Sequence, residues 1–136
     1  MAQTSLDVAK SLYAAFRRKD HEFVLSLFSH EAIVHGPTMS QMILPWGGSY
    51  QGIEDVKQFF KLLGAGLDIE QLDIIDFISE REKVTVLGYI KGKSKTANKS
   101  FETYFAHILK IDLSREQIIE FRVFNDSASL MISMKS

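Results

Sequence analysis

Asp126 is the first residue in this chain whose type and position could do chemistry. It follows an apolar segment over residues 118–124, and the period-two alternation of a strand puts Arg122, Phe124 and Asp126 on one face. If Phe124 lines the interior, Asp126 does too, and an apolar setting raises the pKa of a carboxyl group toward neutral pH. Such a group can serve as a general acid or base. Alternatively, Asp126 pairs with Arg122 or caps the terminal segment.

His107 is the second candidate. It lies in the middle of an alternating segment from Phe101 to Ile111, with Phe105 on the same face. A neutral imidazole in an enclosed site can move a proton or hold a carbonyl oxygen. The alternative is a core histidine bonded to a backbone carbonyl group. We predict that Asp126 and His107 are the catalytic residues.

Other polar and aromatic residues are expected to surround this pair. His35 ends a short predicted strand, residues 32–35, so it could point into the same site or lie half in solvent. Trp46 and Tyr50 belong to an unusually apolar loop, residues 36–52, which should cover either a pocket or the core. The predicted pocket and substrate-binding residues are His35, Trp46, Tyr50, Phe105, Arg122 and Phe124.

Metal and cofactor chemistry has little support in the sequence. His35, His107 and Asp126 would form a chemically adequate two-histidine, one-carboxylate ligand set, but they come from distant segments without a short ligand spacing. The chain has no nucleotide-type Gly-rich loop and no Gly-x-Ser-x-Gly motif. It also has no cysteine, which excludes thiol catalysis and thiolate-bound zinc. We therefore expect neither a metal nor a cofactor.

The elements that must position these residues change in type along the chain. Apolar residues recur at helical spacing after Thr4, after Asp20 and from Ile53 to Leu63, where Gly64 is the expected stop. From about residue 67 the apolar period becomes that of strands joined by short turns. This order predicts an α+β fold, a cone of three N-terminal helices packed on a curved, mainly antiparallel sheet.

The composition limits the class of protein. With 136 residues, 46% hydrophobic and 24% charged, the chain is expected to form one globular domain over residues 1–136. Its net charge of -1 gives no electrostatic support to nucleic-acid binding. No apolar run approaches the ~20 residues of a membrane span, and the N-terminus does not resemble a signal peptide. We expect no membrane partner and a cytoplasmic location.

Two stretches carry a family resemblance. Residues 45–52 read Pro-Trp-Gly-Gly-Ser-Tyr-Gln-Gly, and the last predicted strand ends Arg122-Val-Phe-Asn-Asp126. Together with the order of the elements from about Ser5 to Leu130, they make the chain resemble the nuclear-transport-factor-2-like superfamily, and within it the SnoaL-like polyketide cyclase and ketosteroid-isomerase-related group. The resemblance implies a cone with a small-molecule cavity.

The resemblance also bears on individual residues. SnoaL-like cyclases carry an aspartate at the place of Asp126, and His107 looks like its partner. Tyr13 occurs near the helix on which ketosteroid isomerase carries its oxyanion-hole tyrosine, but the register does not settle its position. That enzyme also needs an aspartate base on the first strand, where this chain has Ile33, Val34 and His35. This departure argues against steroid isomerase chemistry.

Two functions remain open at this stage. One is a cofactor-independent isomerase, cyclase or dehydratase that acts on an apolar carbonyl compound by Asp/His acid-base catalysis. The other is a non-catalytic domain of the same fold that binds a small apolar ligand or another protein. In either case we expect a homodimer, because the last two strands are apolar on both faces and the outer sheet face needs cover.

Overall fold

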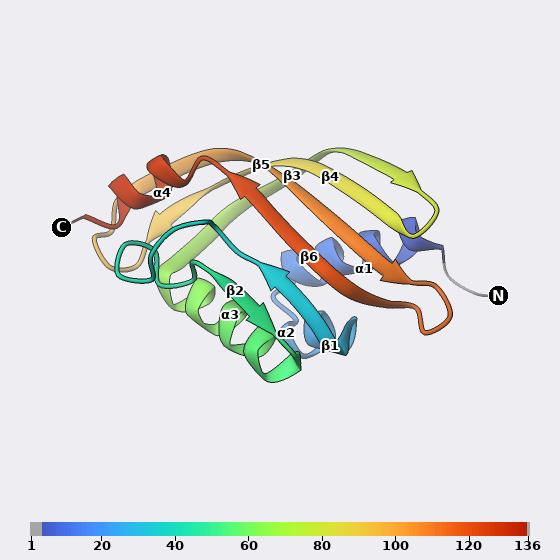
Figure 1. The fold of residues 1–136 in the computed structure, drawn as a ribbon. Helices are drawn as coiled ribbons and strands as arrows, with labels where there is room; N and C mark the ends of the chain where they lie inside the picture. The colour runs from blue at the N-terminus through green and yellow to red at the C-terminus, as the bar shows by residue number, and fades with distance from the viewer. Residues whose placement is uncertain (1–3, 136) are drawn as a thin grey trace.

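A curved sheet with helices against one of its faces makes up the fold (Figure 1). The structure is a computed structural model and describes residues 4–135. In chain order its elements are α1 Ser5–Arg17, α2 His21–Ser26, β1 Phe28–His35, β2 Ser49–Gln51, α3 Ile53–Gly66, β3 Leu67–Glu80, β4 Lys83–Ser94, β5 Ser100–Asp112, β6 Gln117–Asn125 and α4 Ser127–Ser133.

The six strands form one sheet in the order β2-β1-β6-β5-β4-β3. All neighbours pair antiparallel except β1 and β6, which run parallel. Two register shifts interrupt the pairing of the long strand β3 with β4, and irregularities of this kind increase local bending and twist. The predicted α+β architecture is confirmed, with α1, α2 and α3 as the expected helices and the short C-terminal α4 as an addition.

Local sequence signals explain where the first helices begin. The side chain of Thr4 accepts a hydrogen bond from the Asp7 backbone N–H, while the Asp7 carboxylate accepts one from Thr4, which is a capping box. Asp20 caps α2 through the backbone N–H of Phe23.

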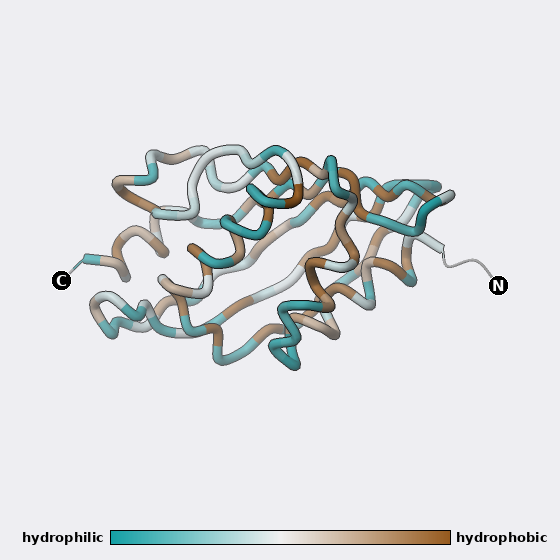
Figure 2. Tube along the Cα trace, turned by 90° about the horizontal axis from the view of Figure 1, so that it is seen from below, coloured by the Kyte–Doolittle hydropathy of each residue, from teal (hydrophilic) through white to brown (hydrophobic). Residues whose placement is uncertain are grey.

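Figure 2 shows hydrophobic residues along the strands and helices, with hydrophilic residues at many of the turns.

Aromatic rings join the helices to the inner face of the sheet. Phe60 on α3 lies 5.6 Å from Phe16 of α1 and 5.6 Å from Phe28 of β1, measured between ring centroids. It also approaches Phe121 on β6, at 6.4 Å. Edge-on and tilted ring contacts of this kind add to the hydrophobic stabilisation of a core.

Within residues 4–135, no helix has both the length and the apolar character needed to cross a membrane.

The end of α3 differs from the sequence prediction. Gly64 does not stop the helix, which continues to Gly66, and Gly64 does not adopt a positive φ. The physical requirement lies two residues later, because a Cβ atom on Gly66 would lie 2.6 Å from Cζ3 of the buried Trp46 ring. Gly66 is needed for close approach of the helix to the indole and not for a left-handed backbone.

The two glycines of α3 therefore make a matched pair of substitutions. We expect Gly66→Ala to lower the free energy of unfolding by about 1–3 kcal/mol, because the added methyl group overpacks the Trp46 site. Gly64→Ala meets no atom within 4 Å and should raise stability by about 0.5–1 kcal/mol through helix propensity. Urea denaturation of both variants measures the difference, and equal effects would contradict this account of Trp46.

Candidate functional site

His107 occupies the inner face of the sheet, among aromatic rings. Its imidazole lies 4.2 Å from the Phe105 ring and 4.9 Å from the Phe121 ring, measured between centroids. Tyr13 of α1 stacks over the same ring at 5.8 Å. The site thus combines one polar ring with apolar surfaces from β5, β6 and α1, and only the tertiary fold brings these segments together.

A short hydrogen bond joins Tyr13 to His107. The Tyr13 hydroxyl oxygen and His107 Nδ1 are 2.5 Å apart. Burial raises the pKa of Tyr13 well above its usual value, so the phenol keeps its proton. Burial also lowers the pKa of His107 to about 3, so its imidazole is neutral at pH 7. Two neutral groups therefore share this bond.

The tautomer of His107 follows from the available partners. If Tyr13 O–H donates to Nδ1, the imidazole proton resides on Nε2. The opposite arrangement would leave the Tyr13 hydroxyl hydrogen without an acceptor in the described part of the chain. Among those residues no buried side-chain nitrogen or oxygen lacks a partner, so Nε2, which has no protein partner, is the accessible nitrogen. The site presents an N–H donor on an apolar wall.

Phe105, which was expected in the pocket, holds one side of the imidazole. Its ring is buried and stacks on His107 with an interplanar angle of 25°. Gly88 on the neighbouring strand β4 leaves room for it, since a Cβ atom there would lie 2.2 Å from Phe105 Cζ. The absence of a side chain at Gly88 thus sets how closely Phe105 can lie against the sheet beside His107.

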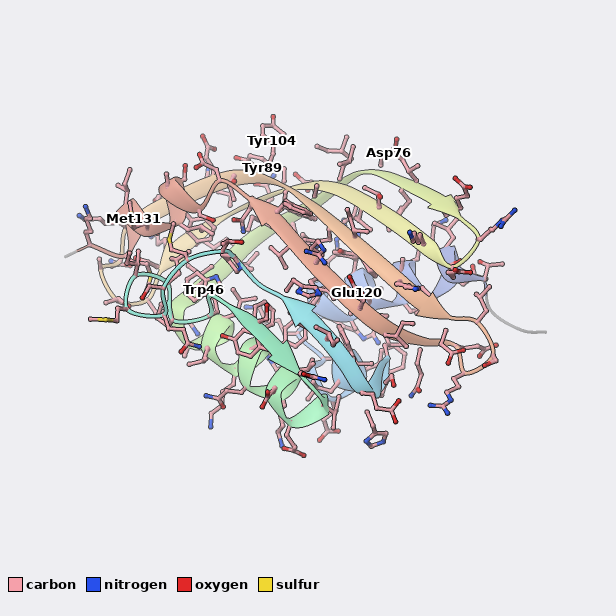
Figure 3. All side chains as sticks on the ribbon, viewed as in Figure 1. Trp46, Asp76, Tyr89, Tyr104, Glu120 and Met131 are labelled. Carbon is pink, nitrogen blue, oxygen red and sulfur yellow. The ribbon has the colours of Figure 1, made fainter. Side chains whose placement is uncertain are left out.

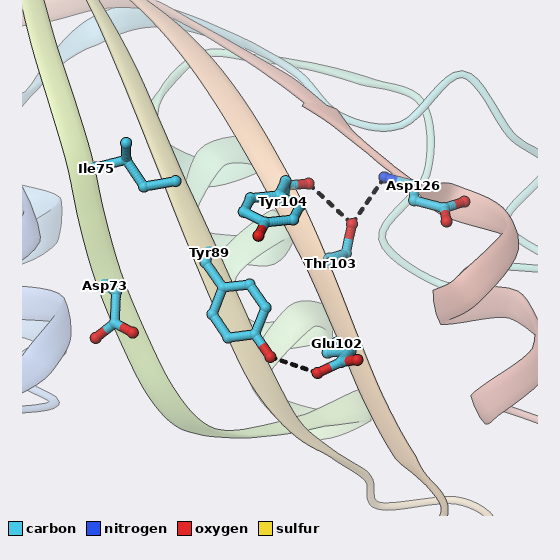
Figure 4. A pocket seen from close by; sticks show the side chains of 7 residues that line it. All are labelled: Asp73, Ile75, Tyr89, Glu102, Thr103, Tyr104 and Asp126. Atoms are coloured by element: carbon cyan, nitrogen blue, oxygen red, sulfur yellow. Dashed lines mark hydrogen bonds between the residues drawn. The ribbon is translucent and has the colours of Figure 1, made fainter.

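Asp126 lies elsewhere and in a different environment from the one predicted. It is exposed at the start of α4 (Figure 4). Its carboxylate caps that helix by accepting hydrogen bonds from the backbone N–H and the hydroxyl group of Ser129, at 3.3 and 2.7 Å. These bonds, the Ser129 hydroxyl first, lower the pKa of Asp126. The expected apolar setting and raised pKa are therefore wrong, and of the two alternatives the structure shows the cap and not the Arg122 pair.

The prediction for Asp126 was wrong because it assigned the wrong face of β6 to the interior. Phe121 and Val123 pack toward the core, opposite Leu109 and His107 of β5, whereas Phe124 is 50% exposed. Side chains alternate along a strand, so placing Phe124 inside turned the predicted face by one residue. Arg122 and Phe124 therefore lie on the outer face, contrary to the predicted pocket.

His35 lies on the outer face as well. Its Nε2 is 3.6 Å from Glu120 Oε1, and the same oxygen is 3.3 Å from the Arg122 guanidinium group. His35, His107 and Asp126 accordingly do not converge, because His107 is on the opposite side of the sheet. No group of three or more residues able to hold a metal ion occurs within residues 4–135.

Trp46 and Tyr50 pack the loop onto the core, which is the second alternative considered for them. Both rings are buried, and Tyr50 lies 5.2 Å from Phe59 of α3. The Tyr50 hydroxyl donates to the Gly47 carbonyl oxygen at 3.0 Å and accepts from Gln41 at 3.2 Å. The Tyr50 hydroxyl group thus serves the loop itself.

Tyr13 is the residue that sequence reasoning left unassigned. Its position on the apolar face of α1 was readable from the helical spacing with Ala9, Leu12 and Phe16. What the spacing could not give is the partner, because α1 and β5 meet only in the folded chain. The contact joins residues 94 positions apart.

The comparisons with known proteins agree with this architecture. The family model described as "SnoaL-like domain" matches residues 9–121. The chain therefore belongs to the SnoaL-like domain family, which is the resemblance noted from the sequence. A search of curated proteins gave no match.

Solved structures show the same fold at low sequence identity. An NTF2-like protein of unknown function from Burkholderia pseudomallei is 19% identical with a TM-score of 0.87, covering 98% of this chain and 99% of its own. TerC, co-crystallised with polyporic acid, is 19% identical with a TM-score of 0.83, covering 97% and 98%. A ketosteroid isomerase-like fold protein from Catenulispora acidiphila, in complex with trimethylamine, is 16% identical with a TM-score of 0.75, covering 94% and 92%.

The pKa of His107 makes stability depend on pH. An unfolded histidine has a pKa near 6.5, whereas the folded value is about 3, so between these values the unfolded chain binds more protons. The contribution is complete above pH ~6.5 and is lost as the pH falls toward ~3. From pH ~7 to ~5, the wild type should lose roughly 1–2 kcal/mol more than His107→Gln, whose side chain does not titrate. Urea denaturation at each pH measures this, and parallel curves would contradict it.

Asp126 gives a second, independent measurement. Asn caps helices as well as Asp does, so Asp126→Asn should change the melting temperature little, while Asp126→Ala removes both bonds to Ser129 and should lower it. Because the folded pKa is lowered, the Asp126 contribution is present above its unfolded pKa and lost at lower pH. A large loss in Asp126→Asn alone would show that the carboxylate has a further partner.

Proposed function

We propose that this SnoaL-like domain binds a small apolar carbonyl compound on the inner face of its sheet, with His107 Nε2–H as the hydrogen-bond donor to the carbonyl oxygen. The observation that supports the proposal is the Tyr13–His107 bond. The bond fixes the orientation of the imidazole and leaves one N–H group available, while burial keeps the imidazole neutral. The ring surfaces of Phe105 and Phe121 suit a flat, apolar ligand.

The proposed chemistry is stabilisation of an enolate. When a proton leaves the carbon next to a carbonyl group, negative charge develops on the oxygen, and a preorganised donor in an apolar site stabilises that charge. Tyr13 acts as a positioning residue, because its hydroxyl group keeps the His107 proton on Nε2. Isomerases, cyclases and dehydratases that work without a cofactor share this step.

The cytoplasmic location expected from the sequence stays a prediction.

A non-catalytic binding domain is the second candidate, and one observation favours it. The inner-face positions of β5 and β6 carry no carboxylate, and Asp126, which was expected to be the base, caps α4. A donor without a nearby base can hold a carbonyl ligand but accelerates proton removal only with the help of solvent. The two candidates therefore differ in turnover and not in the mode of binding.

Deuterium exchange distinguishes them. The apolar aromatic ketone 2-tetralone is incubated with the protein in D₂O, and loss of its α-proton signals is followed by NMR. Wild-type protein should accelerate exchange above the buffer rate, and His107→Phe should lose about 10²–10³-fold of that acceleration. Phe keeps a flat ring of similar size, but it removes both the Nε2 donor and the Nδ1 acceptor of the Tyr13 hydroxyl group.

Tyr13→Phe is the matched control. It removes the hydroxyl group and leaves the ring stacking, so it should reduce the acceleration less than His107→Phe and allow the imidazole proton to redistribute between Nδ1 and Nε2. Nitrogen-15 NMR of the imidazole reports that tautomer directly. Ketone binding that shifts the His107 signals without any exchange supports the binding domain, while absence of both effects contradicts the proposal for this class of ligand.

A further inference from the structure

Asn125 brings a second polar side chain to the inner face of the sheet, close to His107. It ends β6 and stands opposite Phe105 of β5, while Val123, two residues earlier, stands opposite His107. Tyr104 points away from the helices in Figure 3, so its neighbour Phe105 faces them. Residues directly opposite each other in an antiparallel pair share a face. Asn125 therefore faces the helices as well, and it is half-buried.

An asparagine is an unusual residue at such a position. Asn is depleted in β-strands and is mostly found on protein surfaces, because its amide must replace the hydrogen bonds that it gives up to water. Three of the inner-face residues within 101–111 of β5 and 121–125 of β6 are polar, namely Thr103, His107 and Asn125. The others are hydrophobic. Each of the three therefore needs a partner on the protein or on a ligand.

Thr103 uses its hydroxyl group locally. The hydroxyl group donates to the Tyr104 carbonyl oxygen at 2.8 Å and accepts from the Asp126 backbone N–H at 3.0 Å (Figure 4). The second of these bonds fixes the backbone directly after Asn125. His107 and Asn125 are thus the two inner-face residues of these strand segments that can serve a ligand.

A neighbouring hydroxyl group orients the Asn125 amide. Ser127, the first residue of α4, donates from Oγ to Asn125 Oδ1 at 3.2 Å. The carbonyl end of the amide is thereby occupied, whereas its Nδ2 group makes no hydrogen bond within the described residues. No buried side-chain nitrogen in that part of the chain lacks a partner, so Nδ2 is accessible, as His107 Nε2 is. Asn125 presents N–H donors.

The two donors lie diagonally across β5 and β6. Diagonal neighbours on one face of an antiparallel pair are roughly 7–8 Å apart, and side chains stand nearly perpendicular to the sheet. The imidazole of His107 and the amide of Asn125 are therefore roughly 7 Å apart, with the Phe105 ring beside both. Oxygens on adjacent carbon atoms are too close together for this spacing. Oxygens at opposite ends of a fused two-ring skeleton suit it.

We propose that Asn125 is the second hydrogen-bond donor of this site, and that the ligand is an apolar ring compound with two carbonyl oxygens. One oxygen binds to His107 Nε2–H and the other to the Asn125 amide. This inference rests on the proposed function of His107 and adds the substrate class to it. Two fixed donors hold the ligand in one orientation, and a compound with a single oxygen leaves the amide without a partner. Asn125 is thus a specificity-determining residue.

Two decalin ketones test the proposal. The compound trans-2-decalone carries one carbonyl group, and trans-decalin-2,6-dione carries a second one at the far end of the same skeleton. NMR titration of nitrogen-15-labelled protein measures each Kd and reports contact with His107 through its imidazole signals. The dione should bind roughly fivefold more tightly than the decalone, because its second oxygen gains a hydrogen bond.

Asn125→Leu should invert this preference. Leu has a similar volume but no polar atom, so the second oxygen of the dione loses water without gaining a partner. The variant should bind the decalone roughly fivefold more tightly than the dione, with the Kd of the decalone nearly unchanged. An equal effect of the substitution on both ketones would overturn the proposed role of Asn125.

Asn125→Asp is the matched control for shape. It keeps an oxygen that accepts from Ser127 and replaces the N–H donors by a carboxylate oxygen, so it should also lose the preference for the dione. Asn125 is half-buried at the end of a strand, and both variants should melt within a few degrees of the wild type by circular dichroism. If Asn125→Leu does not fold, Asn125→Asp gives the same comparison.

His107→Phe separates this inference from the proposed function. It should weaken the binding of both ketones, because both use His107 Nε2–H. If neither ketone binds to the wild type, the proposed function and this inference both fail. If the decalone binds and shifts the His107 signals but the dione binds no more tightly, the inference about Asn125 alone is overturned.

Discussion

The alternation of side chains across the curved sheet is the constraint on which this structure depends. Each strand gives one face to the helices and the other to the outside, so a single phase along β5 and β6 decides what is enclosed. Phe105, His107 and Leu109 face the helices together with Phe121 and Val123. Every polar group on that side must then find a partner or an opening to solvent.

His107 meets this requirement in a way that leaves one ring nitrogen able to take part in chemistry. Tyr13 satisfies Nδ1, the surrounding rings hold the imidazole neutral, and Nε2 stays accessible. The same burial that would make a lone histidine costly thereby creates an oriented donor. The site depends on packing between α1 and β5 as much as on the identity of the two residues, and membership of the SnoaL-like domain family shows the scaffold without choosing the reaction.

The outer face obeys the same alternation with the opposite result. Residues such as Tyr104, Phe124 and Arg122 lie there because their neighbours in sequence fill the core. The homodimer that the sequence predicted for this apolar face stays a prediction.

The sequence by itself determined the family resemblance and the order and type of the three N-terminal helices, of β1 and of the four long strands, but it predicted neither α4 nor β2, which lies in the segment expected to be a loop. Helical spacing around Leu12, period-two spacing around His107 and the cap at Thr4 are local signals, and each is found in the structure. Local spacing also shows that the residues of a strand alternate between two faces. It does not indicate which face is the inner one when both are apolar. Phe121 and Phe124 are equally hydrophobic, so only packing against Phe28 and Phe60 decided between them. That choice placed Asp126 on the outer surface and joined Tyr13 to His107, because contacts between distant segments exist only in the folded chain.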